Sequence, residues 1–576
     1  MKITIMTACV FTGAQLAGIA TAQVTAPKTK SLNVIAEKSH GKWSNPLRNQ
    51  ILSTQRTKIL EQLKAAGVSI DPKLQAWVDS DETARAAVYG AIYPANPHVL
   101  KNLNTLYSEL GEKMFHQYEQ FCLGTSVARR EIGVGRVNEL SALSKTVAIA
   151  KTYLKEGKDP SVEFAREVSD APKSMTEQAK KLGDYLEEKG ITAQQAWDSE
   201  EHAAALAKLL NVSDAGHGKG RANGLEEVMR DYITAKKVRP VHRTPRMSIA
   251  EFLRHLDKIQ NTDRSELSLS EDQPWPLFPL TKTPWPLLMP LAISMPKDEA
   301  DYIWEKYNGK HGDKRLHTYG PYTKGRPRGD IGKEMTPSAW HWKSYPSKID
   351  TGGVCGTMSF ISRCAQTALG VPVSSGGQPG HGCPIRYAYD SKSGYSAAIE
   401  QSATAGPENS YFYWHFDMPA HRTKFGGTKK KTYAEYQFGL TQGMNVGLES
   451  YMDTHIANHL FLSLDKADQT KYGRSLLLSS LKGNPFNAEA WYNLASSCQT
   501  QEQLDQIIKI CSSLIAGNNE IKYDKPDIVP ADTDLSDRKE GRKALKKLDG
   551  AQKNSAFFRH IVLKHMQEIG SKSIKQ

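Results

Sequence analysis

Apolar positions between residues 49 and 262 recur every three to four residues, which is the period of a helix. One such stretch ends at Gly67, and a longer amphipathic stretch runs from Val99 through Phe121 and ends near Gly124. Capping boxes, which mark helix starts, are predicted by two pairs further along: Thr192 with Gln195, and Ser248 with Glu251. The pattern therefore predicts an α-helical domain over residues 49–262.

Residues 263–300 interrupt this helical pattern. Pro274-Trp275-Pro276-Leu277 is repeated ten residues later as Pro284-Trp285-Pro286-Leu287. Proline at this density is incompatible with the interior of a helix or a central strand, because it lacks an amide donor and fixes its own φ. The segment is too apolar for a free linker, so we expect a strap across a domain junction with its tryptophan rings buried.

Residues 301–447 combine a helix with a hairpin. After the Gly352-Gly353 pair, apolar residues recur with a helical period from Met358 to Leu369, and Gly370 provides a stop signal. Residues 381–389 then alternate in polarity, 390–394 form a turn cluster, and 395–400 form a second strand pattern. We expect one buried helix followed by a β-hairpin.

The two ends of the chain differ from this middle region. Residues 1–22 are apolar after Lys2 and end in Ala20-Thr21-Ala22, which is typical of a secretory signal peptide, and residues 23–48 are polar and predicted to be a linker. Residues 448–576 are helical in pattern, and residues 484–495 resemble the start of a tetratricopeptide helix. We expect a small C-terminal helical domain suited to binding a protein partner.

Composition narrows the functional classes. The chain has 576 residues and a net charge of +13, but its basic residues are spread along the sequence among 62 acidic ones. Nucleic-acid binding is not expected, because no arginine-rich stripe or nucleic-acid motif is present. After the leader, no run approaches the roughly 18 apolar residues of a membrane span. Together with the leader, this predicts a secreted or periplasmic multidomain protein.

Cys355 is the residue with the clearest chemical potential. Its expected position in the first helical turn places it near unpaired amide groups and the positive end of the helix dipole, which favour a thiolate. His381 opens the first strand of the predicted hairpin. Cys364 and Cys383 are interpreted as small buried hydrophobes. In an oxidising compartment, disulfide pairing among Cys122, Cys364, Cys383, Cys498 and Cys511 is open.

This order of a cysteine at a helix start, a Gly-Val-Pro exit and a histidine opening a strand resembles the transglutaminase-like superfamily of papain-like cysteine enzymes. The resemblance covers residues 315–445. It implies an α+β fold, in which the cysteine helix packs on an antiparallel sheet and α-helical domains flank this core. Cys355 corresponds to the family's nucleophile and His381 to its general base.

Two further roles in the family are less sharply matched. Its third catalytic position, an Asp or Asn in relatives, falls on Glu400 or Gln401; pairing of Tyr389 with Tyr395 would select Gln401, and a shift of one residue would select Glu400. For the oxyanion, an indole N–H of Trp342 or Trp340 is a candidate donor.

The resemblance implies thiol-dependent acyl transfer on amide bonds of a protein or peptide, without a metal or cofactor. Either water or an amine can accept the acyl group, giving a protease or amidase in the first case and a cross-linking enzyme in the second. The alternative is a catalytically inactive binding or scaffold protein of the cell envelope. A weak third catalytic residue favours this alternative, because an orienting group holds the histidine ready to act as a base.

Overall fold

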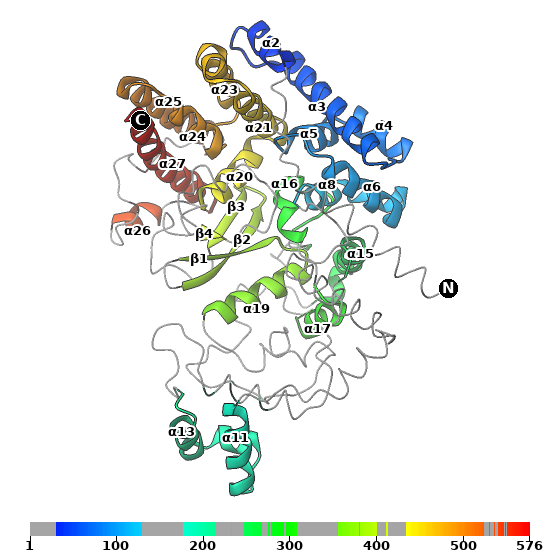
Figure 1. Ribbon diagram of the computed structural model, residues 1–576, viewed down its shortest axis with the longest axis vertical. Helices are drawn as coiled ribbons and strands as arrows, with labels where there is room; N and C mark the ends of the chain where they lie inside the picture. Colours follow the sequence, from blue (N-terminus) through cyan, green and yellow to red (C-terminus); the bar gives the residue numbers. More distant parts are fainter. Residues whose placement is uncertain are drawn as a thin grey trace, which may run out of the picture.

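The computed structural model describes residues 30–128, 177–212, 247–267, 278–292, 295–307, 355–378, 381–399, 411–412, 434–523, 540–546 and 550–575, with single positions between some of them. Helices predominate, and a small antiparallel sheet lies among them (Figure 1). The expected leader at residues 1–22 lies outside the described residues.

The N-terminal region consists of a series of helices. Their bounds are α2 Lys30–Lys38, α3 Asn45–Ala65, α4 Pro72–Ser80, α5 Glu82–Gly90, α6 His98–Leu110, α7 Glu112–Gln117 and α8 Glu119–Ala128. The stretch expected as one long helix from Val99 to Phe121 is thus divided into three. Gly111 causes the first break, because its φ of +77° is a conformation that other residues adopt only with strain.

The proline- and tryptophan-rich segment contains two short helices, α16 Trp285–Leu288 and the 3-10 helix η2 Met289–Ala292. Trp285 is fully buried, and α16 packs on α8 so closely that a Cβ at Gly124 would lie 2.4 Å from the carbonyl oxygen of Trp285. The helices α15 Ile249–Gln260 and α17 Lys297–Tyr307 flank this segment, together with the 3-10 helix η1 Arg264–Glu266. The capping box of Ser248 and Glu251 is present at the start of α15, as predicted.

Three helices form a separate small cluster of buried residues: α11 Glu177–Lys189, α12 Ala193–Asp198 and α13 Glu200–Leu209. The predicted capping box of Thr192 and Gln195 starts α12.

The described part of the chain from residue 434 onward is helical. The bounds of its helices are α20 Ala434–Val446, α21 Leu448–Ser463, α22 Lys466–Asp468, the π-helix η6 Gln469–Gly473, α23 Arg474–Leu481, α24 Ala488–Ser496, α25 Gln501–Tyr523, α26 Glu540–Leu545 and α27 Gly550–Ile574. A helix start lies within residues 484–495, where the side chain of Asn487 caps α24 by accepting from the amide of Ala490 (3.2 Å); the tetratricopeptide-like character stays a prediction.

The sheet has the order β3-β2-β1-β4 and is antiparallel throughout. Its strands are β1 Val373–Gln378, β2 His381–Asp390, β3 Gly394–Ile399 and β4 Tyr411–Phe412. The helix α19 Cys355–Ala368 packs on β1 and β2, whereas α20 and α27 pack on β3 (Figure 1). The predicted helix and hairpin are therefore present.

Buried apolar residues of the sheet, the N-terminal helices and the C-terminal helices belong to one continuous cluster, which runs from Leu32 to Met566. At its centre α5 crosses α21 closely, since a Cβ at Gly90 would lie 2.7 Å from Ile456. Leu32 is itself part of this core, because residues 30–38 of the expected linker form the helix α2.

The expected α+β fold class is wrong. The described residues are mostly helical, the sheet is small, and it is embedded in the helical core instead of forming a transglutaminase-like core between flanking domains. The local motif predicted the helix and hairpin correctly, but it carried no information about what covers them. The domain boundaries inferred from the sequence stay predictions.

Candidate functional site

The helix α19 supplies the first residue of the candidate site. It begins at Cys355, and its buried positions include Ile361, Ala365 and Ala368. Gly370 ends it with a φ of +79°, and a Cβ there would lie 2.8 Å from Nε2 of Gln260, so the turn after the helix requires glycine.

The hairpin supplies the second residue. His381 is the first residue of β2 and pairs with Gln378 of β1. At the other end of β2, Oδ1 of Asp390 accepts from the amides of Lys392 (2.9 Å) and Ser393 (2.8 Å), and the Ser393 bond is the main reason that the pKa of Asp390 lies below its ordinary value. The side chain of Asp390 thus fixes the turn to β3.

Cys355 and His381 each begin an element of one helix–hairpin unit. The 14 residues of α19 span about 20 Å, and a short turn then leads into the 6 residues of β1. The strand β1 pairs antiparallel with β2, and α19 packs on both strands (Figure 1). The cysteine at the helix start and the histidine at the strand start therefore belong to elements that contact each other, and that the two residues meet at one end of the unit stays a prediction.

The other sequence-predicted site residues, Glu400, Gln401, Trp340 and Trp342, lie outside the described residues. The strand register bears on the choice between the first two. Tyr389 pairs with Tyr395, which is the register for which the sequence favours Gln401.

The sequence did not predict how β3 is held. Because β3 is an edge strand of the described sheet, its outward amides and carbonyls have no strand partner among the residues that the structure describes. Asn445 of α20 accepts from the amide of Tyr395 (2.7 Å) and donates to its carbonyl (2.8 Å). Asn554 of α27 makes the same pair of bonds with Ala397. Two asparagines thus replace a neighbouring strand. Their unfavourable position inside helices was the available signal.

The thiols whose side chains are described are not candidate nucleophiles. Cys122, Cys498 and Cys511 are free and buried, so none of these three forms a disulfide, and Cys364 is also buried. Burial raises the pKa values of Cys122, Cys498 and Cys511. Neutral, inaccessible thiols react slowly, which leaves Cys355 distinguished by its place at a helix start.

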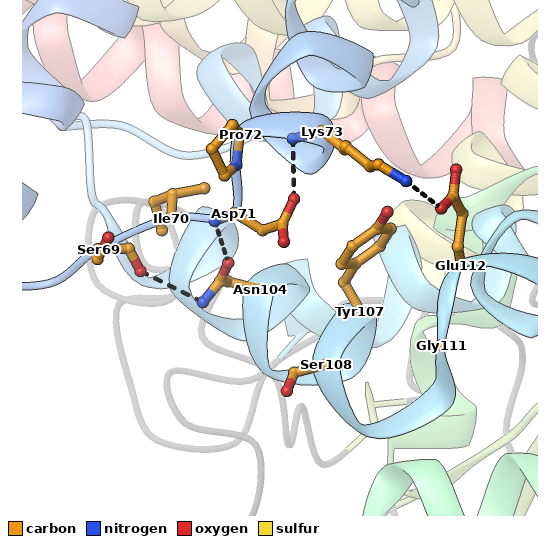
Figure 2. A pocket seen from close by; sticks show the side chains of 10 residues that line it. All are labelled: Ser69, Ile70, Asp71, Pro72, Lys73, Asn104, Tyr107, Ser108, Gly111 and Glu112. Carbon is orange, nitrogen blue, oxygen red and sulfur yellow. Dashed lines mark hydrogen bonds and ion pairs between the residues drawn. The ribbon is translucent and has the colours of Figure 1, made fainter.

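A polar recess of about 560 Å³ lies between the start of α4 and the helices α6 and α7 (Figure 2). Asn104 accepts from the amide of Asp71 (2.8 Å), and Lys73 donates to Glu112 (2.9 Å) across the opening. The Tyr107 hydroxyl points between these charged groups; partial desolvation and the nearby Glu112 raise its pKa. The lining suits a small polar ligand better than an apolar one.

Within the described ranges, no group of three or more His, Cys, Asp or Glu side chains is arranged to hold a metal ion. In the same parts of the chain, no helix combines the length and apolar character needed to cross a membrane.

No family model, curated protein or solved structure matches this sequence.

Proposed function

We propose that this chain is an exported enzyme that transfers acyl groups from amide bonds of a protein or peptide through Cys355, with His381 as general base. The observation that supports the proposal is the packing of the helix that begins at Cys355 on the strand that begins at His381. A helix start favours the thiolate electrostatically, and a histidine near it can move the proton that the reaction requires.

In this proposal the Cys355 thiolate attacks the amide carbonyl carbon and forms a tetrahedral oxyanion. Amides of the first turn of α19 stabilise that oxyanion, with an indole N–H of Trp342 or Trp340 as a further donor. The C–N bond then breaks, and protonated His381 gives its proton to the leaving amine. Water or a second amine attacks the resulting thioester, returns a proton to His381 and releases the thiolate. Glu400 or Gln401 orients the imidazole.

Export is part of the same proposal and has its own test. We expect the protein secreted by a host with a general secretory route to begin near Gln23, as determined by N-terminal sequencing. A protein that keeps residues 1–22 and stays in the cytoplasm would contradict export without affecting the proposed chemistry.

The recess in Figure 2 favours a second candidate function, a binding protein without catalysis. Its charged lining lies on the N-terminal helices, whereas Cys355 begins α19. A ligand that binds normally to a Cys355→Ser variant and is lost when Glu112 is replaced by glutamine would support this function.

Alkylation of the intact protein by iodoacetamide, mapped by peptide mass spectrometry from pH 5 to 9, tests the enzyme proposal. We expect Cys355 to react at pH 6.5 at least about tenfold faster than a free thiol of pKa about 8.5. The buried thiols of Cys122 and Cys511 serve as slow internal references. His381→Ala should slow the labelling of Cys355, whereas His116→Ala, on α7, should not. Slow labelling that is indifferent to His381 would overturn the proposal.

A further inference from the structure

A buried carboxylate links the C-terminal helix α27 to the helix α20. Glu435 of α20 is only 1% exposed. Its Oε1 accepts from the hydroxyl of Tyr492 on α24 (3.0 Å) and lies 3.3 Å from Nδ1 of His565 on α27. The Tyr492 hydroxyl and His565 Nδ1 are 3.2 Å apart, so the three side chains contact one another. The second oxygen of Glu435, Oε2, is buried and makes no hydrogen bond.

Among the described residues, a protonated His565 is the only cation that pairs with the Glu435 carboxylate. Glu568 and Lys564 of α27 also act on the imidazole, with opposite signs, and Cys511 of α25 lies near Tyr492. Burial by itself lowers the pKa of His565, but the hydrogen bond and charge of Glu435 outweigh burial, so this pKa lies above the ordinary 6.5.

We propose that Glu435, Tyr492 and His565 form a pH-sensitive latch that holds α27 on α20. When His565 is protonated, an ion pair crosses the interface between the two helices. When His565 loses its proton, a buried carboxylate with one unpartnered oxygen remains without a compensating charge, which is costly in a protein interior. The latch therefore weakens as His565 is deprotonated.

The sign follows from linkage. The His565 pKa is higher in the docked state than in the undocked one, so the stabilisation of α27 is fully present below pH 6.5. It is lost as pH rises from there through the pKa of the docked state. Each unit by which that pKa is raised corresponds to about a tenfold change in the equilibrium between docked and undocked α27.

Release of α27 would also affect the sheet. Asn554 of α27 holds both the amide and the carbonyl of Ala397 in the edge strand β3. We therefore expect β3 to loosen together with α27. The latch does not depend on the proposed reaction, since neither Cys355 nor His381 takes part in it.

Hydrogen exchange of the full-length protein, followed by mass spectrometry and corrected for intrinsic exchange rates, tests the latch between pH 6.0 and 8.5. Protection factors of peptides from α27 should fall about tenfold across this range, with a parallel fall in β3. Peptides from α6, which lies on the opposite side of the view from α27 in Figure 1, should not show this change.

Three substitutions separate the latch from general effects of pH. His565→Gln should remove the pH dependence of α27, and Glu435→Gln should remove it while keeping α27 protected at pH 8.5. Tyr492→Phe, which deletes only the hydroxyl, should retain the pH dependence. A wild-type protein with no specific change in α27, or a His565→Gln variant that keeps the full change, would overturn the proposal. If His565→Gln does not fold, the proposal is tested by the pH dependence of α27 protection in the wild type and by its loss in Glu435→Gln.

Discussion

Replacing Arg48 with methionine is expected to lower the free energy of unfolding by about 3 kcal/mol. The Arg48 side chain is 3% exposed and contacts three carboxylates: Glu82 of α5 (3.2 Å), and Glu449 (2.7 Å) and Asp453 (3.4 Å) of α21. It therefore joins the N-terminal helices to the C-terminal ones. Methionine preserves much of the buried volume, so the loss reports mainly on the missing charge. Urea titration followed by both tryptophan fluorescence and circular dichroism measures it.

The loss should depend on pH. Burial raises the pKa of Asp453 above its ordinary 3.8, while Trp43 and Arg48 act in the opposite direction. Without Arg48 this pKa rises further, so the penalty of the unpaired carboxylate is present at pH 7 and shrinks as pH falls toward 4. Adding Asp453→Asn to Arg48→Met should recover part of the stability at pH 7. Because Glu82 is 62% exposed, Glu82→Gln is a control expected to change stability by less than about 1 kcal/mol. An Arg48→Met loss no larger than the control would contradict the predicted role.

Local patterns in the sequence predicted local structure well near the candidate site. The helix from Cys355, its end at Gly370, the strand from His381 and the pairing of Tyr389 with Tyr395 all depend on residues close together in the chain. Such features follow from periodicity and turn chemistry, which a single sequence contains.

Periodicity did not predict where a single residue ends a helix within a long apolar pattern. The apolar period continues from Val99 to Phe121, yet the first helix ends before Gly111, because this residue adopts a positive φ between α6 and α7. The pattern identified the buried face correctly, since Val99, Leu103 and Phe121 are all buried. It did not reveal that the face is assembled from separate helices.

Long-range packing could not be predicted. Arg48 hydrogen-bonds to Glu449, which lies 401 residues later in the sequence, and to Asp453, which lies 405 residues later. The asparagines that hold β3 come from α20 and α27. An asparagine inside a helix is an unfavourable choice, but this signal does not tell which strand its side chain binds. These contacts embed the sheet in a helical core, and for that reason the α+β fold expected from the helix and hairpin was wrong.

Replacing Asn554 with alanine is expected to destabilise the protein by about 2–4 kcal/mol, because it leaves two buried backbone groups without partners. Asn554 is 3% exposed, and it holds the amide and carbonyl of Ala397, which is 5% exposed. Water cannot readily replace these bonds. The Asn445→Ala variant provides the comparison: Tyr395 is only half-buried, so water can reach its backbone and the loss should be smaller, about 1 kcal/mol.

The Asn554→Asp variant distinguishes the contributions of the two hydrogen bonds to stability. Aspartate keeps an acceptor for the Ala397 amide but, when ionised, cannot donate to the Ala397 carbonyl and adds a buried charge. At pH 7 we expect a loss at least as large as for alanine. Burial would raise the pKa of the new carboxyl, so stability should recover relative to alanine as pH falls and the protonated carboxyl donates to the carbonyl. Urea titrations at pH 7 and pH 4.5 measure this recovery, with Asn518→Ala on α25 as a control. If Asn554→Ala and the control had equal effects, Asn554 would not be what holds the edge of the sheet.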